Sequence, residues 1–197
     1  MKVVAFNGSA RKDGNTAILI REVFKELEKE GFKTELVQLA GEKISGCIAC
    51  YKCFSAKNRR CAVTDDIVNE CIAKMEDAQG IILGSPTYFA DCTAQLKALM
   101  ERAGFVSRAN GEMFKRKIGA AVVAVRRAGA IHAFDTINHF FTIGQMITVG
   151  SSYWNIGLGR EAGQVQKDEE GLLTMSTLGR NMAWLIKKCT GTDEKEF

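Results

Sequence analysis

Short apolar runs alternate along this chain with longer segments in which apolar residues recur every three or four positions. The short runs indicate buried strands, and the longer spacing indicates helices with one apolar face. Alternation of the two is typical of β-α-β units, in which helices connect the strands of a parallel sheet. The runs predict strands at residues 2–6, 32–39, 80–84, 118–125 and 147–152.

Helices are predicted between and after these strands. The first places Ala17, Ile20, Phe24 and Leu27 on one stripe and ends at Gly31. The alternation predicts an α/β fold with a flavodoxin-like, doubly wound, five-stranded parallel sheet in three α/β/α layers. We expect a single domain over residues 1–197. The five helices are expected at 16–30, from Asp66 onward, and at 91–103, 130–143 and 170–188.

Composition and charge exclude several classes of protein. Apolar residues make up 46% of the 197 residues and charged residues 25%, which is ordinary for a globular domain. No stretch approaches the roughly 20 apolar residues of a membrane span, and the N-terminus enters a strand pattern at once, so we expect a cytoplasmic protein without membrane contact. The net charge of +4 is too small to indicate nucleic-acid binding. Basic residues at Lys52, Lys57, Arg59 and Arg60 form either a solvated surface or a docking face for an anionic partner.

Residues 7–16, which follow the first strand, have features of a phosphate-binding loop. A helix N-terminus carries free N–H groups and a partial positive charge. Ser9, Asn15 and Thr16 add neutral donors there, and Arg11 adds a charged one. The dinucleotide and Walker patterns are absent. An ordinary capped turn from strand to helix explains the same residues, so this segment alone leaves anion binding open.

Two further loops follow predicted strands at the same end of the sheet, where ligands of such folds bind. Residues 84–89 read Gly-Ser-Pro-Thr-Tyr-Phe. Pro86, the only proline, fixes its own φ and biases Ser85 towards extended backbone. Thr87, Tyr88 and Phe89 are then expected to offer backbone N–H groups and an aromatic surface to a flat ring, and core packing is the alternative role of the aromatic residues. A similar turn after the fourth strand, residues 126–129, contains Arg126 and Gly129.

Four of the seven cysteines lie in the irregular segment 43–63. Cys47, Cys50 and Cys53 have three-residue spacing, and Cys61 follows. Four thiolates can hold a [4Fe-4S] cluster. Zinc more often uses two separated C-x2-C pairs, a thioredoxin-like dithiol uses one pair, and free thiols in an exposed loop need no metal. The remaining three, Cys71, Cys92 and Cys189, fall on or next to apolar stripes and are expected to act as small hydrophobic residues.

These loops resemble those of a known family. Residues 8–16, Gly-Ser-x-Arg-x-x-Gly-Asn-Thr, resemble the FMN-phosphate loop of the NADPH-dependent FMN reductases and multimeric flavodoxins, and residues 84–89 are similar to the loop along the flavin ring. The cysteine segment resembles the compact motif of iron–sulfur flavoproteins, although its gap from Cys53 to Cys61 is at the long end of their range. The resemblance implies FMN on Ser9, Arg11, Gly14, Asn15, Thr16, Pro86, Thr87, Tyr88, Phe89, Arg126 and Gly129, and a [4Fe-4S] cluster on Cys47, Cys50, Cys53 and Cys61.

The function expected from this resemblance is that of an FMN-dependent oxidoreductase without a catalytic side-chain acid or base. It is expected to move electrons from NADPH, NADH or a reduced redox protein such as ferredoxin to an acceptor. The alternatives are a cluster-free NAD(P)H-dependent FMN reductase, an electron carrier without a small-molecule substrate, and a redox sensor with a dithiol switch. The family also implies homodimers or homotetramers in which a neighbouring subunit closes the flavin site, with Trp184 as a candidate contact.

Overall fold

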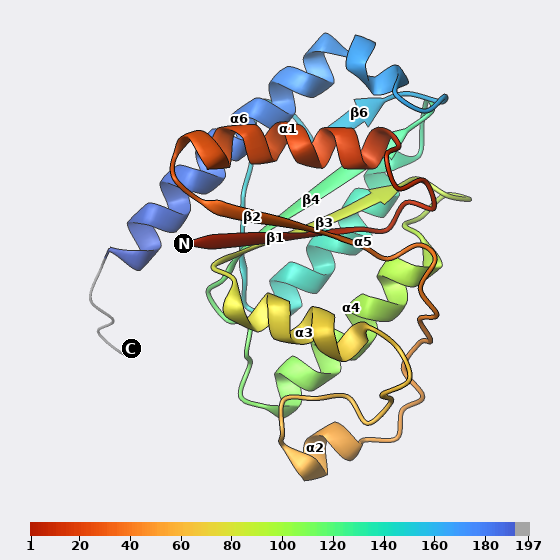
Figure 1. The fold of residues 1–197 in the computed structure, drawn as a ribbon, viewed down its shortest axis with the longest axis vertical. Helices are drawn as coiled ribbons and strands as arrows, with labels where there is room; N and C mark the ends of the chain where they lie inside the picture. Colours follow the sequence, from red (N-terminus) through yellow and green to blue (C-terminus); the bar gives the residue numbers. More distant parts are fainter. Residues whose placement is uncertain (192–197) are drawn as a thin grey trace.

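The computed structural model describes residues 1–191, so residues 192–197 of the expected domain lie outside the described part. Its parallel sheet has the strand order β2-β1-β3-β4-β5, with a further strand, β6, also paired with β4 (Figure 1). This is the flavodoxin-like order, and the prediction of the fold is confirmed. The strands are β1 (Lys2–Asn7), β2 (Lys33–Gln38), β3 (Gly80–Pro86), β4 (Ile118–Val125), β5 (Ile147–Thr148) and β6 (Ile156–Leu158).

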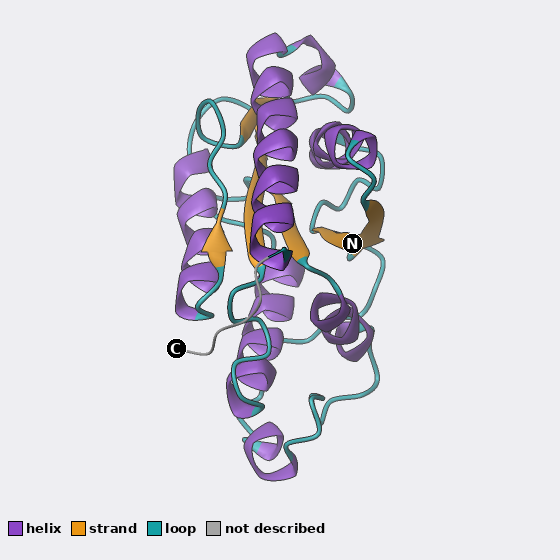
Figure 2. Cartoon of the chain, turned by 90° about the vertical axis from the view of Figure 1, so that its left-hand side faces the viewer, coloured by secondary structure: helices purple, strands orange, loops and turns teal. Residues whose placement is uncertain are grey.

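Helices cover both faces of the sheet and give the three layers that were expected (Figures 1 and 2). The helices α1 (Asn15–Lys29) and α6 (Glu169–Thr190) lie on one face. On the other face lie α3 (Val68–Asp77), α4 (Ala94–Ala109) and α5 (Ala130–Ile143). The short helix α2 (Lys52–Ala56), in the cysteine segment, lies at the end of the molecule beyond α3 and α4. A 3-10 turn, η1 (Gln164–Lys167), precedes α6.

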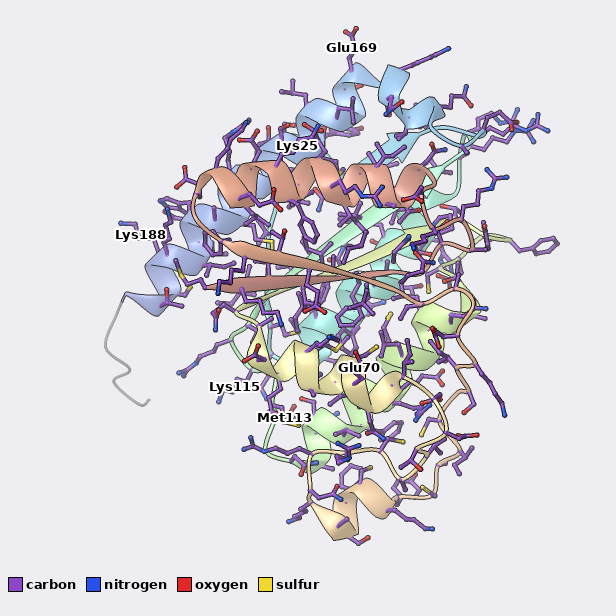
Figure 3. The ribbon with its side chains drawn as sticks, in the orientation of Figure 1. Lys25, Glu70, Met113, Lys115, Glu169 and Lys188 are labelled. Atoms are coloured by element: carbon purple, nitrogen blue, oxygen red, sulfur yellow. The ribbon has the colours of Figure 1, made fainter. Side chains whose placement is uncertain are left out.

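The uninterrupted apolar runs follow from this double coverage, because a strand buried on both faces needs apolar side chains at every position. In β1, Val3 and Ala5 face α1 and α6, whereas Val4 and Phe6 face the opposite helices, and all four are fully buried. Figure 3 shows the side chains that fill these two layers, with Glu169 and Lys188 at the two ends of α6. Among the described residues, no helix is long and apolar enough to cross a membrane.

The fifth strand differs from the prediction of one run over 147–152. Thr148 pairs with Gly119 of β4, the chain then leaves the sheet, and pairing with β4 resumes at Ile156, opposite Val123. Polar side chains bond to one another within the break, where the Ser151 hydroxyl donates to Asn155 Oδ1 at 2.6 Å. The prediction is therefore wrong beyond Thr148, because local side-chain bonds replace the strand ladder there.

The start of α4 also differs, at Ala94 instead of residue 91. Asp91 is held outside the helix by a two-way backbone pairing with Tyr88. The Thr93 side chain then accepts from Leu96 N–H and serves as the helix N-cap. The helix continues past residue 103 to Ala109, with Val106 and Ala109 among its buried residues.

Candidate functional site

A pocket of about 520 Å³ opens at the carboxyl ends of β1, β3 and β4. We call it the strand-end pocket. Three loops from distant parts of the chain form its walls, at the end of the sheet where the crossover geometry favours ligand binding. It is lined by the expected residues Ser9, Arg11, Asn15, Thr16, Pro86, Thr87, Tyr88 and Arg126, and by Ala124, Val125, Gly159 and Arg160.

The loop after β1 is held by the amide side chains of Asn7, which is buried, and Gln38, which is half-buried. Asn7 donates to Gln38 Oε1 at 2.7 Å and accepts from Ser9 N–H at 3.1 Å. Gln38 in turn donates to the Ser9 carbonyl at 2.7 Å. Gly8 lies so close to the start of α4 that a Cβ atom there would be 2.7 Å from Thr93 Oγ1. This wall of the pocket is therefore fixed before any ligand binds.

The N-terminus of α1 opens into the pocket without a side-chain cap. Gly14 occupies the N-cap position and has no side chain to accept the first N–H groups of the helix. The Thr16 hydroxyl beside it is buried and has no hydrogen-bond partner in the described chain, and the same holds for the Thr87 hydroxyl on another wall. A buried polar group left unpaired costs about 1–3 kcal/mol, so two in one pocket indicate a ligand with polar groups.

Asn15 lines the pocket, but its side-chain N–H groups are already engaged. They donate to the carbonyls of Gly159 and Glu161, both at 2.9 Å, and its Oδ1 accepts from Val165 N–H. Asn15 therefore builds the third wall, which contains Arg160. The sequence analysis missed this wall because its residues lie some 145 positions from the phosphate-type loop and carry no recognisable pattern.

The loop after β3 differs from the expectation that its backbone N–H groups face a ligand. Thr87 N–H continues the sheet by donating to the Ala124 carbonyl, and Tyr88 N–H donates to Asp91. Phe89 and Ala90 have φ values of 45° and 79°, which make a tight turn at the tip. Phe89 is fully exposed and does not line the strand-end pocket, so the structure separates it from the other predicted residues.

The two glycines assigned to the site have backbone roles and do not line the pocket. Gly14 precedes α1, and Gly129 precedes α5 with a φ of 88°, a conformation that favours glycine. A Cβ on Gly129 would lie 3.7 Å from Thr87 Cγ2, so this turn supports the Thr87 side of the pocket from behind.

The strand-end pocket is electropositive. Arg11, Arg126 and Arg160 line it, and no carboxylate is among its lining residues. Arg11 Nη1 donates to the Arg160 carbonyl at 3.2 Å, which connects the first and third walls. Three guanidinium groups beside an uncapped helix N-terminus suit a ligand with a phosphate group.

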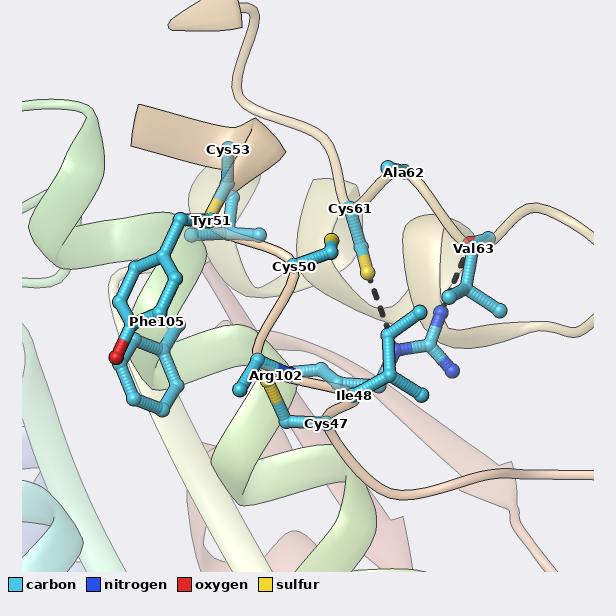
Figure 4. Close-up of a pocket in the computed structure, with 12 residues that line it drawn as sticks. Cys47, Ile48, Cys50, Tyr51, Cys53, Cys61, Ala62, Val63, Arg102 and Phe105 are labelled. Carbon is cyan, nitrogen blue, oxygen red and sulfur yellow. Dashed lines mark hydrogen bonds between the residues drawn. The ribbon is translucent and has the colours of Figure 1, made fainter. Parts of the chain in front are cut away.

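A second pocket is lined by all four cysteines of the segment (Figure 4). We call it the cysteine pocket. It shares no lining residue with the strand-end pocket. All four cysteines are free thiols, and only Cys50 is classed as exposed. The other lining residues are Ile48, Ala49, Tyr51, Ala62, Val63, Arg102, Phe105 and Val106.

The backbone of the segment directs the cysteines to one space. Ala49 and Tyr51, on either side of Cys50, both have left-handed φ values, 51° and 53°. The Ala49 N–H donates to Cys47 Sγ at 3.4 Å. The rings of Tyr51, Phe54 and Phe105 pack together, with centroids 6.1–6.4 Å apart, and make an apolar rim.

Two residues that the sequence analysis missed hold Cys61. Asn69 of α3 accepts from Cys61 N–H at 2.7 Å and donates to its carbonyl at 3.0 Å. Arg102 of α4 donates from Nε to Cys61 Sγ at 3.3 Å. The available signal was the place of Arg102 on the stripe of α4 that contains Leu99 and Val106, because a charged residue on a buried stripe is unusual.

The cysteines outside this pocket divide into two kinds. Burial raises the pKa of the Cys71 thiol to about 12 and that of Cys92 to about 11, so both behave as the expected small hydrophobic residues. Cys189 differs from that expectation because it is exposed. Within the cysteine pocket, burial also raises the pKa of Cys53 above its ordinary value.

The fold and the strand-end pocket define the class of flavodoxin-like proteins with a nucleotide-type ligand. A profile of the NADPH-dependent FMN reductases matches residues 1–161. The chain is 38% identical to an iron-sulfur flavoprotein of Methanocaldococcus jannaschii over 194 residues, 95% of this chain and 98% of that protein. It is 31% identical to an iron-sulfur flavoprotein of Methanosarcina thermophila over 189 residues, 95% and 96% of the two chains.

Solved structures show the same fold. RosB, crystallised with 8-demethyl-8-formylriboflavin-5'-phosphate, aligns with a TM-score of 0.78 at 18% identity, over 98% of this chain and 81% of that one. A flavodoxin from the domain Archaea aligns with a TM-score of 0.62 at 16% identity, over 95% and 99%. The chain belongs to the NADPH-dependent FMN reductase family, in the branch of the iron–sulfur flavoproteins. It is an FMN-dependent oxidoreductase.

Proposed function

We propose that the chain moves electrons between a reduced donor and an acceptor through FMN in the strand-end pocket, with a [4Fe-4S] cluster in the cysteine pocket. The observation that carries the first part is the pair of buried, unpartnered hydroxyls of Thr16 and Thr87 in one pocket. We infer that NADPH, NADH or a reduced redox protein is the donor.

The uncapped start of α1 and the Thr16 hydroxyl are assigned to the FMN phosphate. Arg11, Arg126 and Arg160 balance its charge. We assign the wall containing Thr87 to the flavin ring. Bound FMN supplies the chemistry, since a flavin accepts a hydride or single electrons while the protein binds and orients it.

The test of this assignment is the pair Thr16→Val and Thr87→Val, which remove one hydroxyl each with little change in shape. We expect the FMN dissociation constant to rise about tenfold in each variant, the equivalent of one lost hydrogen bond. Quenching of flavin fluorescence measures it. Thr142→Val is the matched control, because its hydroxyl bonds only to carbonyls of its own helix. Unchanged affinity in both variants would place FMN elsewhere.

The cysteine pocket fits an iron–sulfur cluster by the chemistry of its donors. Four thiols surround one space with an apolar rim, and two N–H groups already donate to sulfur, on Cys47 and Cys61. No three His, Cys, Asp or Glu side chains in residues 1–191 are placed to hold one metal ion. An iron–sulfur cluster supplies one-electron chemistry.

The test of the cluster is an anaerobic absorption spectrum together with iron and sulfide assays. We expect about four iron and four sulfide per chain, and loss of both in Cys50→Ser. Flavin bands without iron would leave a plain FMN reductase. Zinc in place of iron would also contradict the proposal.

A second candidate function is that of an electron carrier that docks redox proteins. Lys52, Lys57 and Arg60 are exposed residues of the cysteine segment, whereas Arg59 is paired with Glu76. These cations favour an acidic partner such as a ferredoxin. Steady-state turnover with NADPH or NADH alone favours the enzyme with its own substrate, and turnover only with a reduced protein favours the carrier.

We also propose that the chain forms a homodimer or homotetramer. Tyr88 and Phe89 project beside the strand-end pocket, and Phe89 buries none of its ring in the single chain. Trp184 on α6 is 61% exposed. Aromatic residues are enriched in protein–protein interfaces relative to the rest of the surface. Light scattering of the purified protein measures the mass, and a monomer at micromolar concentration would contradict this proposal.

A further inference from the structure

Arg102 is the largest fully buried side chain among the described residues, and it lines the cysteine pocket. The side chain has no exposed surface. Burial of a cation is unfavourable unless it is paired and its N–H groups are satisfied. An apolar residue would fill the same space without this cost. We therefore expect the charge or the N–H groups of Arg102 to have a role here.

The guanidinium contacts both ends of the cysteine segment. Nη1 donates to the Ser45 carbonyl at 3.3 Å, before the first cysteine. Nη2 donates to the Val63 carbonyl at 2.8 Å, and Nε donates to Cys61 Sγ at 3.3 Å, near the last cysteine (Figure 4). One side chain of α4 thus ties the two ends of the segment together.

Asp66 balances the charge of Arg102. Its Oδ2 accepts from Nη1, and its side chain is only 2% exposed. Burial opposes ionisation of Asp66, but the hydrogen bonds from Arg102 and from Val68 N–H outweigh it, and the pKa of Asp66 lies below its usual value. The Asp66 carboxylate and Cys61 Sγ contact different nitrogens of the guanidinium. The sulfur therefore faces the cation of this ion pair and not its carboxylate.

We propose that Arg102 is a positioning residue that fixes Cys61 and, through its Nε–H bond to Cys61 Sγ and its buried charge, raises the reduction potential of the cluster. This inference rests on the proposed cluster. Hydrogen bonds to the sulfurs, net charge and exposure to solvent set the potential of an iron–sulfur centre. Reduction adds one negative charge, which a buried cation beside a ligand stabilises.

The pair Arg102 and Asp66 provides a test in which two changes have opposite signs. We expect Arg102→Met to lower the reduction potential, because it removes a cation and a donor. Arg102→Lys keeps the charge but has no planar fork to span these groups, so a smaller shift in the same direction is expected. Asp66→Asn keeps the oxygen that accepts from Val68 N–H and removes the balancing charge, so the potential is expected to rise.

The measurement is an anaerobic redox titration followed by electron paramagnetic resonance, with iron and sulfide assayed in each protein. Arg108→Met is the matched control, because it removes one exposed positive charge from the same helix and is expected to leave the potential unchanged. A second readout does not require the cluster. In iron-free protein, limited trypsin cleavage after Lys57 and Arg60 is expected to be faster in Arg102→Met than in the wild type, because the hydrogen bonds from Arg102 to both ends of the segment are lost.

The outcomes separate this inference from the proposed function. Opposite shifts at the two positions support it. Equal potentials, or shifts of the same sign, overturn it while the iron content of the wild type still supports the cluster. If Arg102→Met fails to load iron, the sign of the shift in Asp66→Asn decides. Wild-type protein that holds no iron overturns both the inference and the proposed cluster.

Discussion

Gly8 illustrates how a single position shapes the strand-end pocket. The turn after β1 and the start of α4 approach so closely that a Cβ atom on Gly8 would lie 2.7 Å from Thr93 Oγ1 and 3.0 Å from Leu96 Cβ. Because Leu96 is fully buried, the crowding cannot be relieved by moving a flexible side chain into solvent. The absence of a side chain at Gly8 is therefore a packing requirement.

We expect Gly8→Ala to cost about 1–3 kcal/mol of unfolding free energy, as added groups in packed sites do. It should also weaken FMN binding at least tenfold, because the loop that carries Ser9 must shift. Urea unfolding and flavin titration measure the two effects. Gly150→Ala is the control, since a Cβ there meets no atom within 4 Å. Equal values for Gly8→Ala and wild type would show that the turn moves freely.

The buried thiol of Cys71 has a consequence for stability in alkali. Its pKa is about 12 in the fold against 9.0 for an ordinary thiol, because burial disfavours the thiolate. Between these values the unfolded chain releases a proton that the folded chain keeps, so unfolding becomes easier as pH rises. We expect the unfolding free energy of the wild type to fall more steeply from pH 9 to 12 than that of Cys71→Ala. Parallel curves in urea unfolding at several pH values would contradict this.

At the residue scale, the sequence predicted most of the side chains that line the strand-end pocket. It did not predict the hydrogen bonds that these side chains make. Thr16 and Asn15 are adjacent polar residues, yet the Thr16 hydroxyl is unpaired whereas the Asn15 amide is consumed by Gly159 and Glu161. Phe89 was expected at a flavin ring and lies at the tip of a turn. Whether a side chain is hydrogen-bonded depends on partners that are distant along the chain. A local sequence pattern does not contain those partners.

At the scale of elements, Asp168 connects β6 to α6. Its Oδ1 accepts from Gly171 N–H at 3.0 Å as the N-cap of α6, and its Oδ2 accepts from Leu158 N–H at 2.6 Å. A Cβ on Gly171 would lie 2.4 Å from Asp168 Oδ2, so the helix start and the carboxylate are closely fitted. The final helix is thereby attached to the last strand.

We expect Asp168→Ala to lower the unfolding free energy by about 1–2 kcal/mol, since it removes the cap and leaves Leu158 N–H without its acceptor. Asp168→Asn keeps one acceptor oxygen, which serves only one of the two N–H groups, and should lose less. The urea midpoint measures each change. Glu170→Ala, in the exposed first turn of the same helix, is the control. If Glu170→Ala lowered the unfolding free energy as much as Asp168→Ala, the effect would come from the charge at the start of the helix and not from the cap.

Element prediction succeeded where apolar periodicity was strong and failed where polar side chains bond locally. The helix over Ala130–Ile143 was predicted to the residue. The run at 147–152 was not, because Ser151 and Asn155 satisfy each other and the chain leaves β4. Helix α2 was missed because it has five residues, none of them buried, so no apolar stripe marks it.

At the scale of the whole molecule, α4 connects two pockets that share no lining residue. Thr93, its N-cap, donates from its N–H to Ser85 Oγ of β3, next to Pro86, which lines the strand-end pocket. Arg102, which lines the cysteine pocket, lies nine residues further, about 14 Å along the axis. The sequence predicted the helix at 91–103 and two separate groups of candidate residues, and the structure places those groups in two pockets spaced by this helix.

This separation predicts independent loading. A variant with Cys47, Cys50, Cys53 and Cys61 all changed to serine is expected to keep the wild-type FMN affinity within about twofold, because its changes lie outside the strand-end pocket. Thr16→Val is expected to keep its iron while FMN binding weakens. Flavin titration and iron assay on both variants measure this. Loss of FMN with the cysteines would show that the two sites fold as one unit.

The break between β5 and β6 has a further consequence for the purified protein. This margin of the sheet offers only two short paired stretches, two and three residues long, instead of one straight run of free donors and acceptors. A second molecule therefore finds no continuous template along which to extend the sheet. The interruption protects this α/β protein against aggregation through its own margin, and restoring a regular strand there would remove that protection.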